Sequence, residues 1–374
     1  MKIKIPTKLM LSGEWSILEV NNPCIVLAIN KYVSAKIKPQ QEKITIKAED
    51  INLESIEAKF NPKTNKLIFA KKLNRTELEK ISFLKESIEL TLGYLKYKKI
   101  TLQNFKIETS SKNTLLKLED GTTQKIGLGS SAAITVASIS AILKLHEQNI
   151  KLKRTKNLIF KLAASAHFLA QGKMGSGFDI AASTFGGATV YKRFDHSWLS
   201  KKLESKKITW NIFEKRWPKL SIKKINLPDK FHLCVCWSGK PASTKNLILK
   251  INRFKKEKEE LYFDIINKIK KITSKLIEIL ENYQPTLQEK IVELIRENEK
   301  ELMELGEKSK VGLETKNLVK AIKIANNYGG GGKISGAGSG DCAIAVCFKQ
   351  DTATKIKNEW KEKGLQPIRV KISP

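Results

Sequence analysis

Apolar and polar residues alternate with a period of two near the start of the chain, which predicts short β-strands. The clearest strands are 33–38 and 43–47, separated by Pro39-Gln40-Gln41. Between 76 and 96 the apolar residues recur at every third or fourth position, as in a helix that buries one face. The same two periods predict strands at 105–108, 231–237, 342–348 and 367–372, and helices at 130–145, 155–170, 244–282, 285–306, 315–328 and 351–363.

This mixture of elements predicts an α+β fold in which helices pack on mostly antiparallel sheets. The chain has 374 residues, more than one hydrophobic core usually organises, so we expect two domains. Long amphipathic helices dominate only after the strand at 231–237. We therefore place the boundary close to that strand and predict domains at 1–225 and 226–374.

The composition indicates a soluble protein in a reducing compartment. The apolar share is 41%, and no run of about 18 uncharged apolar residues occurs, so we expect no membrane association. Met1 leads into an alternating segment and not into an apolar signal region, so a cytoplasmic location is expected. An odd number of unpaired cysteines favours buried thiols over disulfides or a zinc site; they are Cys24, Cys234, Cys236, Cys342 and Cys347.

The formal charge of +31 raises the question of nucleic-acid binding. Lysine is spread over nearly every segment, however, and no RNA-binding aromatic motif, zinc finger or arginine stripe concentrates the charge. A basic protein also attracts small polyphosphates. The charge does not separate these alternatives, and we expect small-molecule partners and no nucleic acid.

A glycine-serine loop precedes the predicted helix at 130–145. Glycines let a backbone approach a ligand closely, and the free N–H groups of a first helical turn attract anions. Two serine hydroxyls there can cap the helix, bind phosphate oxygens or ligate Mg²⁺. No Gly-Lys-Ser/Thr follows, so this is not a Walker A loop. Phosphate binding and plain capping fit the loop equally well; its residues are Gly127, Leu128, Gly129, Ser130, Ser131 and Ala132.

A second glycine-rich segment lies about two hundred residues later. Four glycines at 329–332 are followed by Lys333-Ile334-Ser335-Gly336-Ala337-Gly338-Ser339-Gly340-Asp341-Cys342 and then by a predicted strand. Ordering each glycine costs roughly 0.5–1 kcal/mol relative to alanine, so a plain spacer is a poor explanation for two such loops. A flexible surface loop remains the alternative.

Together the two loops resemble the second and third motifs of the GHMP kinases. An N-terminal segment, Lys8-Leu9-Met10-Leu11-Ser12-Gly13-Glu14-Trp15-Ser16-Ile17-Leu18, is similar to the first motif of that family. The three matches occur in family order from residue 8 to 346 and so cover most of the chain. The resemblance implies a two-domain fold, with an N-terminal α+β domain like a ribosomal-protein domain and a C-terminal ferredoxin-like domain. ATP and Mg²⁺ are the implied cofactors.

Two further segments resemble phosphomevalonate kinases more than other members. They are 166–183, with the run Gly175-Ser176-Gly177-Phe178-Asp179, and 237–244, with Trp237-Ser238-Gly239-Lys240-Pro241. The implied reaction is the transfer of the ATP γ-phosphoryl group to 5-phosphomevalonate, giving 5-diphosphomevalonate for isoprenoid synthesis. Mevalonate, a related mevalonate phosphate or a sugar are alternative acceptors. An inactive or nucleic-acid-associated homologue is the alternative of another class.

The resemblance also implies roles for residues. The backbone of the 127–132 loop would hold ATP, and Ser131, with Ser130 as the alternate, would bind Mg²⁺. Lys8 would neutralise the moving phosphoryl group. Asp179 matches the residue usually considered a base in kinases of alcohols. A phosphate acceptor is already mostly dianionic at neutral pH, so we expect Asp179 mainly to orient Lys8.

Substrate contacts are expected from three places. Lys240, Ser243 and Thr244 lie at a strand-to-helix junction, where a helix starting near Ser243 would point its amides at the 5-phosphate. The full set is Lys240, Ser243, Thr244, Ser176, Gly336, Ala337 and Gly338. An ordinary helix cap is the alternative for the 240–244 group. His167 is interpreted as a packed core residue in preference to a catalytic one. The sequence allows a monomer or a homodimer.

The sequence departs from the family pattern at two positions. Mevalonate kinases carry a metal-binding glutamate eleven residues before the aspartate, where this chain has Phe168. This difference disfavours mevalonate kinase and leaves a second Mg²⁺ ligand unassigned. A proline usual before the glycine-serine loop is absent, and Lys125 in that segment would add a positive charge near the nucleotide.

Overall fold

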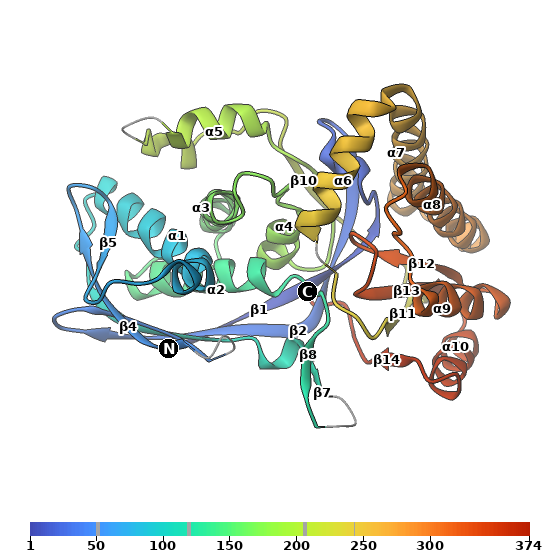
Figure 1. Cartoon of the computed structure of the whole chain (residues 1–374), viewed down its shortest axis with the longest axis horizontal. Coiled ribbons are helices and arrows are strands. Elements are labelled where there is room, and N and C mark those ends of the chain that lie inside the picture. Colours follow the sequence, from blue (N-terminus) through green and yellow to red (C-terminus); the bar gives the residue numbers. More distant parts are fainter. Residues whose placement is uncertain (50–52, 118–120, 205–207, 243) are drawn as a thin grey trace.

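The computed structural model describes residues 1–49, 53–117, 121–204, 208–242 and 244–374. Two units lie side by side, each with its own sheet and helices (Figure 1). The first unit contains β1 (Lys2–Ser12), β2 (Pro23–Gln40), β3 (Ile44–Ala48), β4 (Leu53–Asn61), β5 (Lys66–Phe69), α1 (Arg75–Tyr97), β6 (Asn104–Ser110), β7 (Leu115–Lys117), β8 (Thr123–Lys125), α2 (Ser130–Leu145), α3 (Lys153–Ala170), α4 (Phe178–Phe185), β9 (Ala188–Lys192), α5 (His196–Glu204) and β10 (Ser221–Ile225).

The sheet of the first unit follows the order β10-β9-β2-β6-β3-β4-β5, with β1 paired to β2. Its pairs are antiparallel except for β3 with β6, which are parallel. Helices α1, α2 and α4 cover one face of this sheet, and α3 packs on these helices (Figure 1). The prediction of helices on a mostly antiparallel sheet is confirmed here. The alternating residues predicted at 33–38 belong to β2, and those predicted at 43–47 belong to β3. Strand β2 pairs with β1, β6 and β9 and so joins both halves of this sheet.

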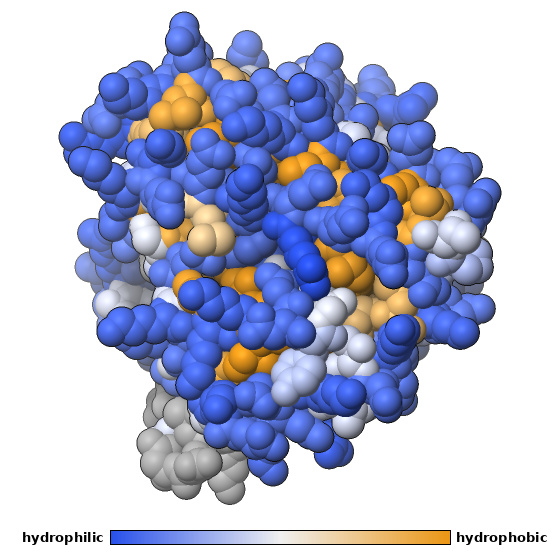
Figure 2. All heavy atoms as spheres, turned by 90° about the vertical axis from the view of Figure 1, so that its right-hand side faces the viewer, coloured by the Kyte–Doolittle hydropathy of each residue, from blue (hydrophilic) through white to orange (hydrophobic). Residues whose placement is uncertain are grey.

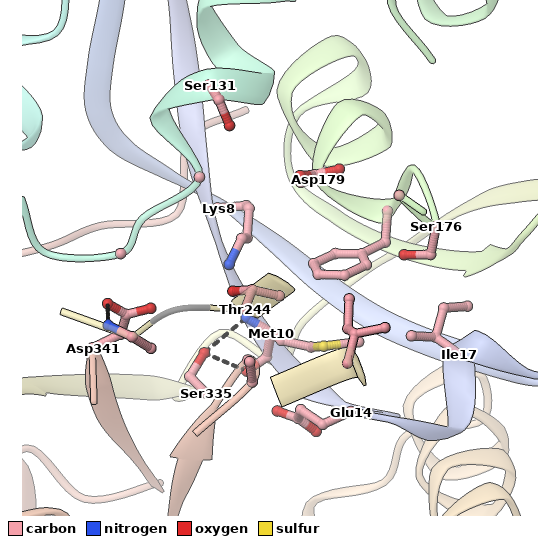
Figure 3. Close-up of a pocket in the computed structure, with 18 of the residues that line it drawn as sticks. Lys8, Met10, Glu14, Ile17, Ser131, Ser176, Asp179, Thr244, Ser335 and Asp341 are labelled. Carbon is pink, nitrogen blue, oxygen red and sulfur yellow. Dashed lines mark hydrogen bonds between the residues drawn. The ribbon is translucent and has the colours of Figure 1, made fainter. Parts of the chain in front are cut away.

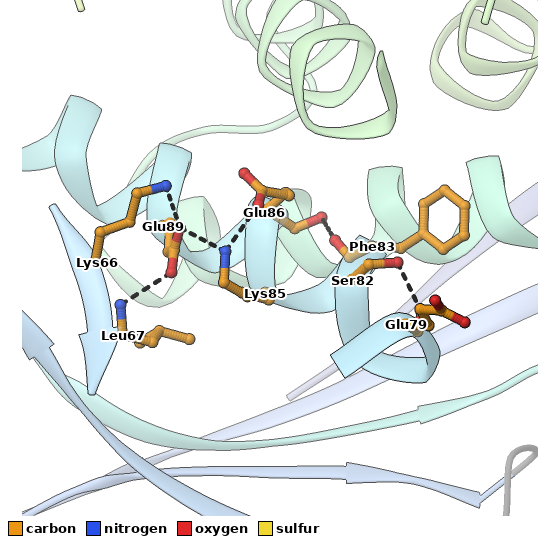
Figure 4. A network of polar contacts seen from close by, with 9 residues as sticks. Lys66, Leu67, Glu79, Ser82, Phe83, Lys85, Glu86 and Glu89 are labelled. Atoms are coloured by element: carbon orange, nitrogen blue, oxygen red, sulfur yellow. Dashed lines mark hydrogen bonds and ion pairs between the residues drawn. The ribbon is translucent and has the colours of Figure 1, made fainter. Parts of the chain in front are cut away.

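Helix α1 is fixed to the edge of the sheet by a buried carboxylate (Figure 4). Glu89 is 2% exposed, and its Oε1 accepts a hydrogen bond of 3.0 Å from the Leu67 amide in β5. Its Oε2 lies 2.8 Å from Lys66 Nζ and 3.1 Å from Lys85 Nζ. Because a buried charge is costly unless it is paired, these contacts explain how a glutamate is accommodated in the core.

The second unit has the strand and helix order of a ferredoxin-like domain. Its four-stranded sheet has the order β12-β13-β11-β14, and every pair is antiparallel. Its elements are β11 (His232–Trp237), α6 (Thr244–Glu257), α7 (Glu259–Glu281), α8 (Gln288–Ser309), α9 (Lys316–Asn327), β12 (Gly331–Ser335), β13 (Cys342–Cys347), α10 (Gln350–Glu362) and β14 (Gln366–Ile368). The predicted ferredoxin-like arrangement is therefore confirmed.

The two units share a continuous hydrophobic core. Leu9 and Leu27, on β1 and β2, belong to one buried cluster with Leu276 of α7 and Ile344 of β13. The last residues also return to the first sheet, where Ser373 donates a hydrogen bond of 2.9 Å to the Ala28 carbonyl. The two sheets therefore hold the segments between them in a fixed arrangement. The boundary between residues 225 and 226 stays a prediction.

The structure corrects three expectations from the hydrophobic pattern. The single helix expected over 244–282 is two helices, because the backbone leaves the helical region at Lys258. Helices α4 and α5 were not predicted. Part of the four-glycine segment is not a loop, since Gly331 and Gly332 start the buried strand β12. A Cβ at Gly332 would lie 2.9 Å from the Ile322 carbonyl oxygen of α9, so the glycine permits close packing of that helix.

The exterior of the second unit is largely hydrophilic, and apolar side chains form separate small groups on the face that Figure 2 shows. All five cysteines are buried and free, as expected. Among the residues that the structure describes, no helix has the length and apolar character required to cross a bilayer.

Candidate active site

The side chain of Lys8 lies between the two glycine-rich loops. Its backbone amide donates a hydrogen bond of 3.0 Å to the Leu128 carbonyl, which joins β1 to the first loop. A Cβ at Gly129 would lie 3.0 Å from Lys8 Cε, and a Cβ at Gly336 would lie 3.9 Å from Lys8 Nζ. A side chain at Gly129 would press on the Lys8 stem, whereas at Gly336 the distance leaves room for a Cβ and it is the φ of 97° that favours glycine. The predicted convergence of the two loops is present in the structure.

The first loop ends in the N-terminus of a long buried helix. Gly129 is the N-cap of α2 and has a φ of 77°, in the left-handed region that glycine adopts without strain. No side chain caps the helix, so Ser130 and Ser131 in its first turn are not used as caps. The first-turn amides and the positive end of the helix dipole favour an anion at this position.

A cavity of about 400 Å³ opens at this point and draws its walls from both units. Figure 3 shows Lys8 projecting into its centre, with Ser131 and Asp179 on one side and Ser335 and Asp341 on the other. The predicted residues that line it are Lys8, Gly127, Gly129, Ser130, Ser131, Ser176, Asp179, Thr244, Gly336 and Ala337. Residues from five separate segments of the chain therefore meet at one cavity.

Asp179, in the first turn of α4, is held by its own helix and by α3. Its Oδ1 accepts a hydrogen bond of 2.9 Å from the Ile180 amide, and its Oδ2 lies 3.9 Å from His167 Nε2. Among the described residues no ion pair joins Asp179 to Lys8 within 4 Å. Orientation of Lys8 by direct contact with Asp179 would therefore require these side chains to move when ligands bind.

His167 is buried, as expected, yet its ring faces the cavity wall. Its Nε2 lies 3.3 Å from Ser131 Oγ, so one imidazole is next to both Ser131 and Asp179. Burial lowers the pKa of this histidine, and the nearby Asp179 carboxylate opposes that shift. The ring stacks at 5.0 Å from Phe83. His167 thus connects the N-terminus of α2 to the N-terminus of α4.

The wall at 175–177 is supported from behind by β9 and α5. Ser176 is 6% exposed, and its carbonyl accepts a hydrogen bond of 2.7 Å from the Tyr191 hydroxyl. The His196 ring bonds to the Gly175 backbone, and burial lowers the His196 pKa to about 4. Gly177 has a φ of 85° and is the N-cap of α4. These contacts fix the turn that presents Asp179.

The second glycine loop is fixed to β1 and to the turn that follows it. Ser335 Oγ accepts from the Met10 amide and donates to the Met10 carbonyl, both at 2.9 Å. Lys333 and Glu14 form an ion pair in which both side chains are 0% exposed. Lys333 Nζ also donates to the Ile334 carbonyl at 2.6 Å. The first and third motifs are therefore joined by buried polar contacts.

Several predicted residues do not line the cavity. The side chains of Leu128 and Ala132 are buried behind the loop, and Lys240 is exposed outside the cavity, where its carbonyl accepts from the Asp341 amide at 2.8 Å. Gly338 packs against Leu313. Ser243 lies outside the described residues, although α6 does begin at Thr244 as expected.

Other lining residues received no role from the sequence. Asp341 lies in the quoted glycine-rich segment and Glu14 in the first motif, but neither was assigned. For Asp341 the available signal was an acidic residue within a glycine-rich loop that was expected to contact the substrate. Lys125, which the sequence indicated only as an added charge, also lines the cavity. It pairs with Leu115 at the base of the β7–β8 hairpin.

A helix N-terminus and a lysine between two glycine loops, with a carboxylate opposite, define a phosphotransferase site. Comparison with known proteins also indicates a phosphotransferase. Residues 83–187 match the GHMP kinase N-terminal domain and 286–366 match the GHMP kinase C-terminal domain. The chain belongs to the GHMP kinases, and it is an enzyme that transfers phosphoryl groups.

Several relatives match nearly the whole chain. A phosphomevalonate kinase from Streptomyces sp. (strain CL190) is 26% identical over 373 residues, covering 97% of this chain and 94% of the relative. A mevalonate kinase from Pyrococcus abyssi is 28% identical over 369 residues, covering 94% of this chain and 90% of the relative. The structure of Streptococcus pneumoniae phosphomevalonate kinase in complex with phosphomevalonate and AMPPNP has a TM-score of 0.82 at 24% identity, covering 100% of this chain and 99% of that one.

Proposed function

We propose that this kinase transfers the γ-phosphoryl group of ATP to 5-phosphomevalonate and so produces 5-diphosphomevalonate in the mevalonate pathway. An oxygen of the acceptor phosphate attacks the γ-phosphorus, the bond to the β–γ bridging oxygen breaks, and ADP leaves. The observation that carries the proposal is the arrangement of positive groups around one cavity. Lys8, Lys125 and the N-terminus of α2 all face it.

The charge of the reactants explains why several positive groups are needed. The acceptor phosphate has a second pKa of about 6 and is mostly a dianion at neutral pH. Two polyanions must therefore approach each other, and phosphoryl transfer depends mainly on positioning and on neutralising this charge. Lys8 is 8% exposed and central, whereas Lys125 is exposed at the mouth. We assign Lys8 to the transferred group and Lys125 to the nucleotide phosphates.

The proposed site roles follow from position. The loop at 127–132 would hold the triphosphate, chiefly through its main-chain amides. Ser176, Thr244, Gly336 and Ala337 would bind the acceptor, since they line the same cavity and lie outside the nucleotide loop. Lys240 and Gly338 would act on the acceptor only indirectly, because neither lines the cavity. The expected contact from Ser243 stays a prediction. Because the acceptor phosphate is already ionised, no base is needed to activate it. We therefore assign Asp179 mainly to orienting Lys8, and only secondarily to removing a proton.

The residues present fit Mg²⁺. This ion prefers oxygen ligands and usually keeps waters and substrate phosphates with only one or two protein groups. The Ser131 hydroxyl and the Asp179 carboxylate are oxygens on the same side of Lys8, and His167 lies next to both. The ion would neutralise charge on the phosphates when bound. Within the described residues no cluster of three or more acidic, His or Cys side chains offers an all-protein metal site.

Mevalonate is the second candidate acceptor, because mevalonate kinases match at similar identity. The position that resembles their metal-binding glutamate is occupied by Phe168, which is 2% exposed and packs on Phe194 at 6.2 Å. A metal ligand cannot be supplied from within this aromatic cluster. This observation favours a phosphorylated acceptor, which brings its own oxygen ligands to the ion.

An ADP-release assay with a panel of acceptors tests the proposal. The panel contains mevalonate, phosphomevalonate, diphosphomevalonate, homoserine and galactose, each with ATP and Mg²⁺. We expect phosphomevalonate to give a kcat/KM at least about 10²-fold above that of mevalonate, because the uncharged 5-hydroxyl of mevalonate would leave the positive groups at the acceptor position unpaired. Turnover of mevalonate alone would refute the acceptor assignment.

Replacement of Lys125 tests the charge argument. Lys125→Gln is expected to lower kcat/KM for ATP about tenfold, because one cation near the phosphates is lost. Lys144→Gln is the matched control, since Lys144 is exposed at the far end of α2. Equal kinetics for the two variants would contradict a role of Lys125 in nucleotide binding.

A further inference from the structure

Asp341 places a carboxylate where the two glycine-rich loops and the start of α6 meet. It follows Gly340, directly before β13, and its backbone has a φ of 56°. Its side chain lines the cavity (Figure 3), yet among the described residues it forms no ion pair within 4 Å. An acidic group in a cavity built for polyanions works against their binding. It is therefore expected to have a compensating role.

The carboxylate occupies the space beside Gly127. A Cβ at Gly127 would overlap all three atoms of the Asp341 carboxyl group. Gly127 belongs to the nucleotide loop of the first unit, and Asp341 belongs to the second unit. This contact is where the two glycine loops touch. It also explains why residue 127 has no side chain, independently of its φ of 68°.

The same residue holds the segment 238–242 through three hydrogen bonds. Asp341 Oδ1 accepts from the Ala242 amide at 3.0 Å. The Asp341 amide donates to the Lys240 carbonyl at 2.8 Å, and its carbonyl accepts from the Ser238 amide at 2.8 Å. Two of these bonds join backbone atoms only. The Asp341 side chain therefore contributes one bond, the one that holds the Ala242 amide. Pro241, Ala242 and Thr244 form the cavity wall there.

Burial and bonding act in opposite directions on this carboxyl group. Burial raises the pKa of Asp341, while the bond from the Ala242 amide and the charge of Lys8 lower it. An asparagine at this position would keep an acceptor oxygen for the Ala242 amide and would remove the charge. The bond and the charge can therefore be separated by substitution.

We propose that Asp341 is a positioning residue that holds the acceptor wall at Pro241 and Ala242 against the nucleotide loop at Gly127. The assignment of the two sides of the cavity to acceptor and nucleotide rests on the proposed function. The tether itself does not. Loss of the tether moves the wall, while the nucleotide loop keeps its own support from Lys8 and α2.

Three variants test this inference. Asp341→Ala removes the tether, Asp341→Asn keeps the acceptor oxygen, and Gly127→Ala displaces the carboxyl group from the other unit. Hydrogen exchange of the amides in 238–242 is measured by mass spectrometry, together with KM for phosphomevalonate and for ATP. The matched controls are Asp351→Ala, an exposed aspartate in α10, and Gly121→Ala, where φ is 80° and nothing lies within 4 Å of a Cβ.

We expect exchange in 238–242 to accelerate about tenfold in Asp341→Ala and in Gly127→Ala, and to stay near wild type in Asp341→Asn and both controls. The phosphomevalonate KM should rise about tenfold in Asp341→Ala, with a change below about threefold for ATP. If Asp341→Ala does not fold, the Gly127→Ala exchange result decides. Unchanged exchange in Gly127→Ala, or Asp341→Asn as impaired as Asp341→Ala, would overturn the proposal. The exchange measurements need no substrate, so they stand even if phosphomevalonate is not turned over.

Discussion

The ion pair between Glu14 and Lys333 offers a direct test of how the two units are held together. Glu14 follows β1 of the first unit, and Lys333 lies on β12 of the second. Both side chains are 0% exposed. The second carboxylate oxygen of Glu14 has no partner among the described residues, so Lys333 is its main stabilising contact. Lys333→Met replaces the ammonium group by an apolar group of similar length.

The expected effect is large because the remaining carboxylate stays buried. Breaking a buried ion pair by removing one partner costs about 3–5 kcal/mol, compared with a total stability of about 5–15 kcal/mol for a typical domain. The double variant Glu14→Gln with Lys333→Met removes both charges. It should recover about 1–3 kcal/mol relative to Lys333→Met alone. Urea unfolding followed by circular dichroism gives the free energies of unfolding.

An exposed pair in the first unit provides the control. Lys43 and Glu57 lie 2.6 Å apart with side chains 39% and 42% exposed. Lys43→Met should change the free energy of unfolding by less than about 1 kcal/mol, since solvent screens this pair. A loss below about 1 kcal/mol in Lys333→Met, or a double variant as unstable as the sum of the single ones, would refute the reasoning.

Two further predictions concern the site and its support. Gly129→Ala should lower kcat/KM at least about tenfold, because the new Cβ would press on the Lys8 stem, whereas Gly121→Ala has a similar φ but open space and should leave kinetics near wild type. Equal losses of kcat/KM in the two variants would show that backbone strain, and not the contact with Lys8, causes the effect. His196 has a folded pKa of about 4, against an ordinary value of about 6.5, so the unfolded chain takes up a proton first as the pH falls. Stability should therefore decline by up to about 3 kcal/mol between pH 6.5 and 4, and urea titrations of His196→Gln should show a smaller decline; parallel curves for the two proteins would contradict this.

The sequence predicted most elements because their hydrophobic period was clear. The helices at α1, α2 and α3 and the strand β11 agree with the predicted ranges to within two or three residues. The segment 178–185 was missed because it is only eight residues long and its N-cap is Gly177, which carries no capping side chain. The strand β12 was missed because its glycines are chosen for packing against α8 and α9, and single-chain propensity disfavours them in a strand.

The site was predictable where short motifs carry the chemistry. The order of the motifs indicated Lys8, Asp179 and the two glycine loops, and the structure gathers them at one cavity. The sequence indicated Lys125 only as an added charge near the nucleotide. The role of Asp341 depends on distances across the two units, which no local pattern encodes. The contact of His167 could not be predicted either. Its helical spacing indicated a core position, but the nearby Ser131 hydroxyl belongs to another helix and is not visible in that spacing.

A crystal structure of this chain with a non-hydrolysable ATP analogue and phosphomevalonate would examine the central claim most directly. We predict triphosphate oxygens within hydrogen-bonding distance, about 3 Å, of the amides at the start of α2. The Lys8 ammonium group should lie between the γ-phosphate and the acceptor phosphate. Binding of the nucleotide away from the Gly127–Ser131 turn, or an acceptor phosphate out of line with the γ-phosphate and remote from Lys8, would contradict the account.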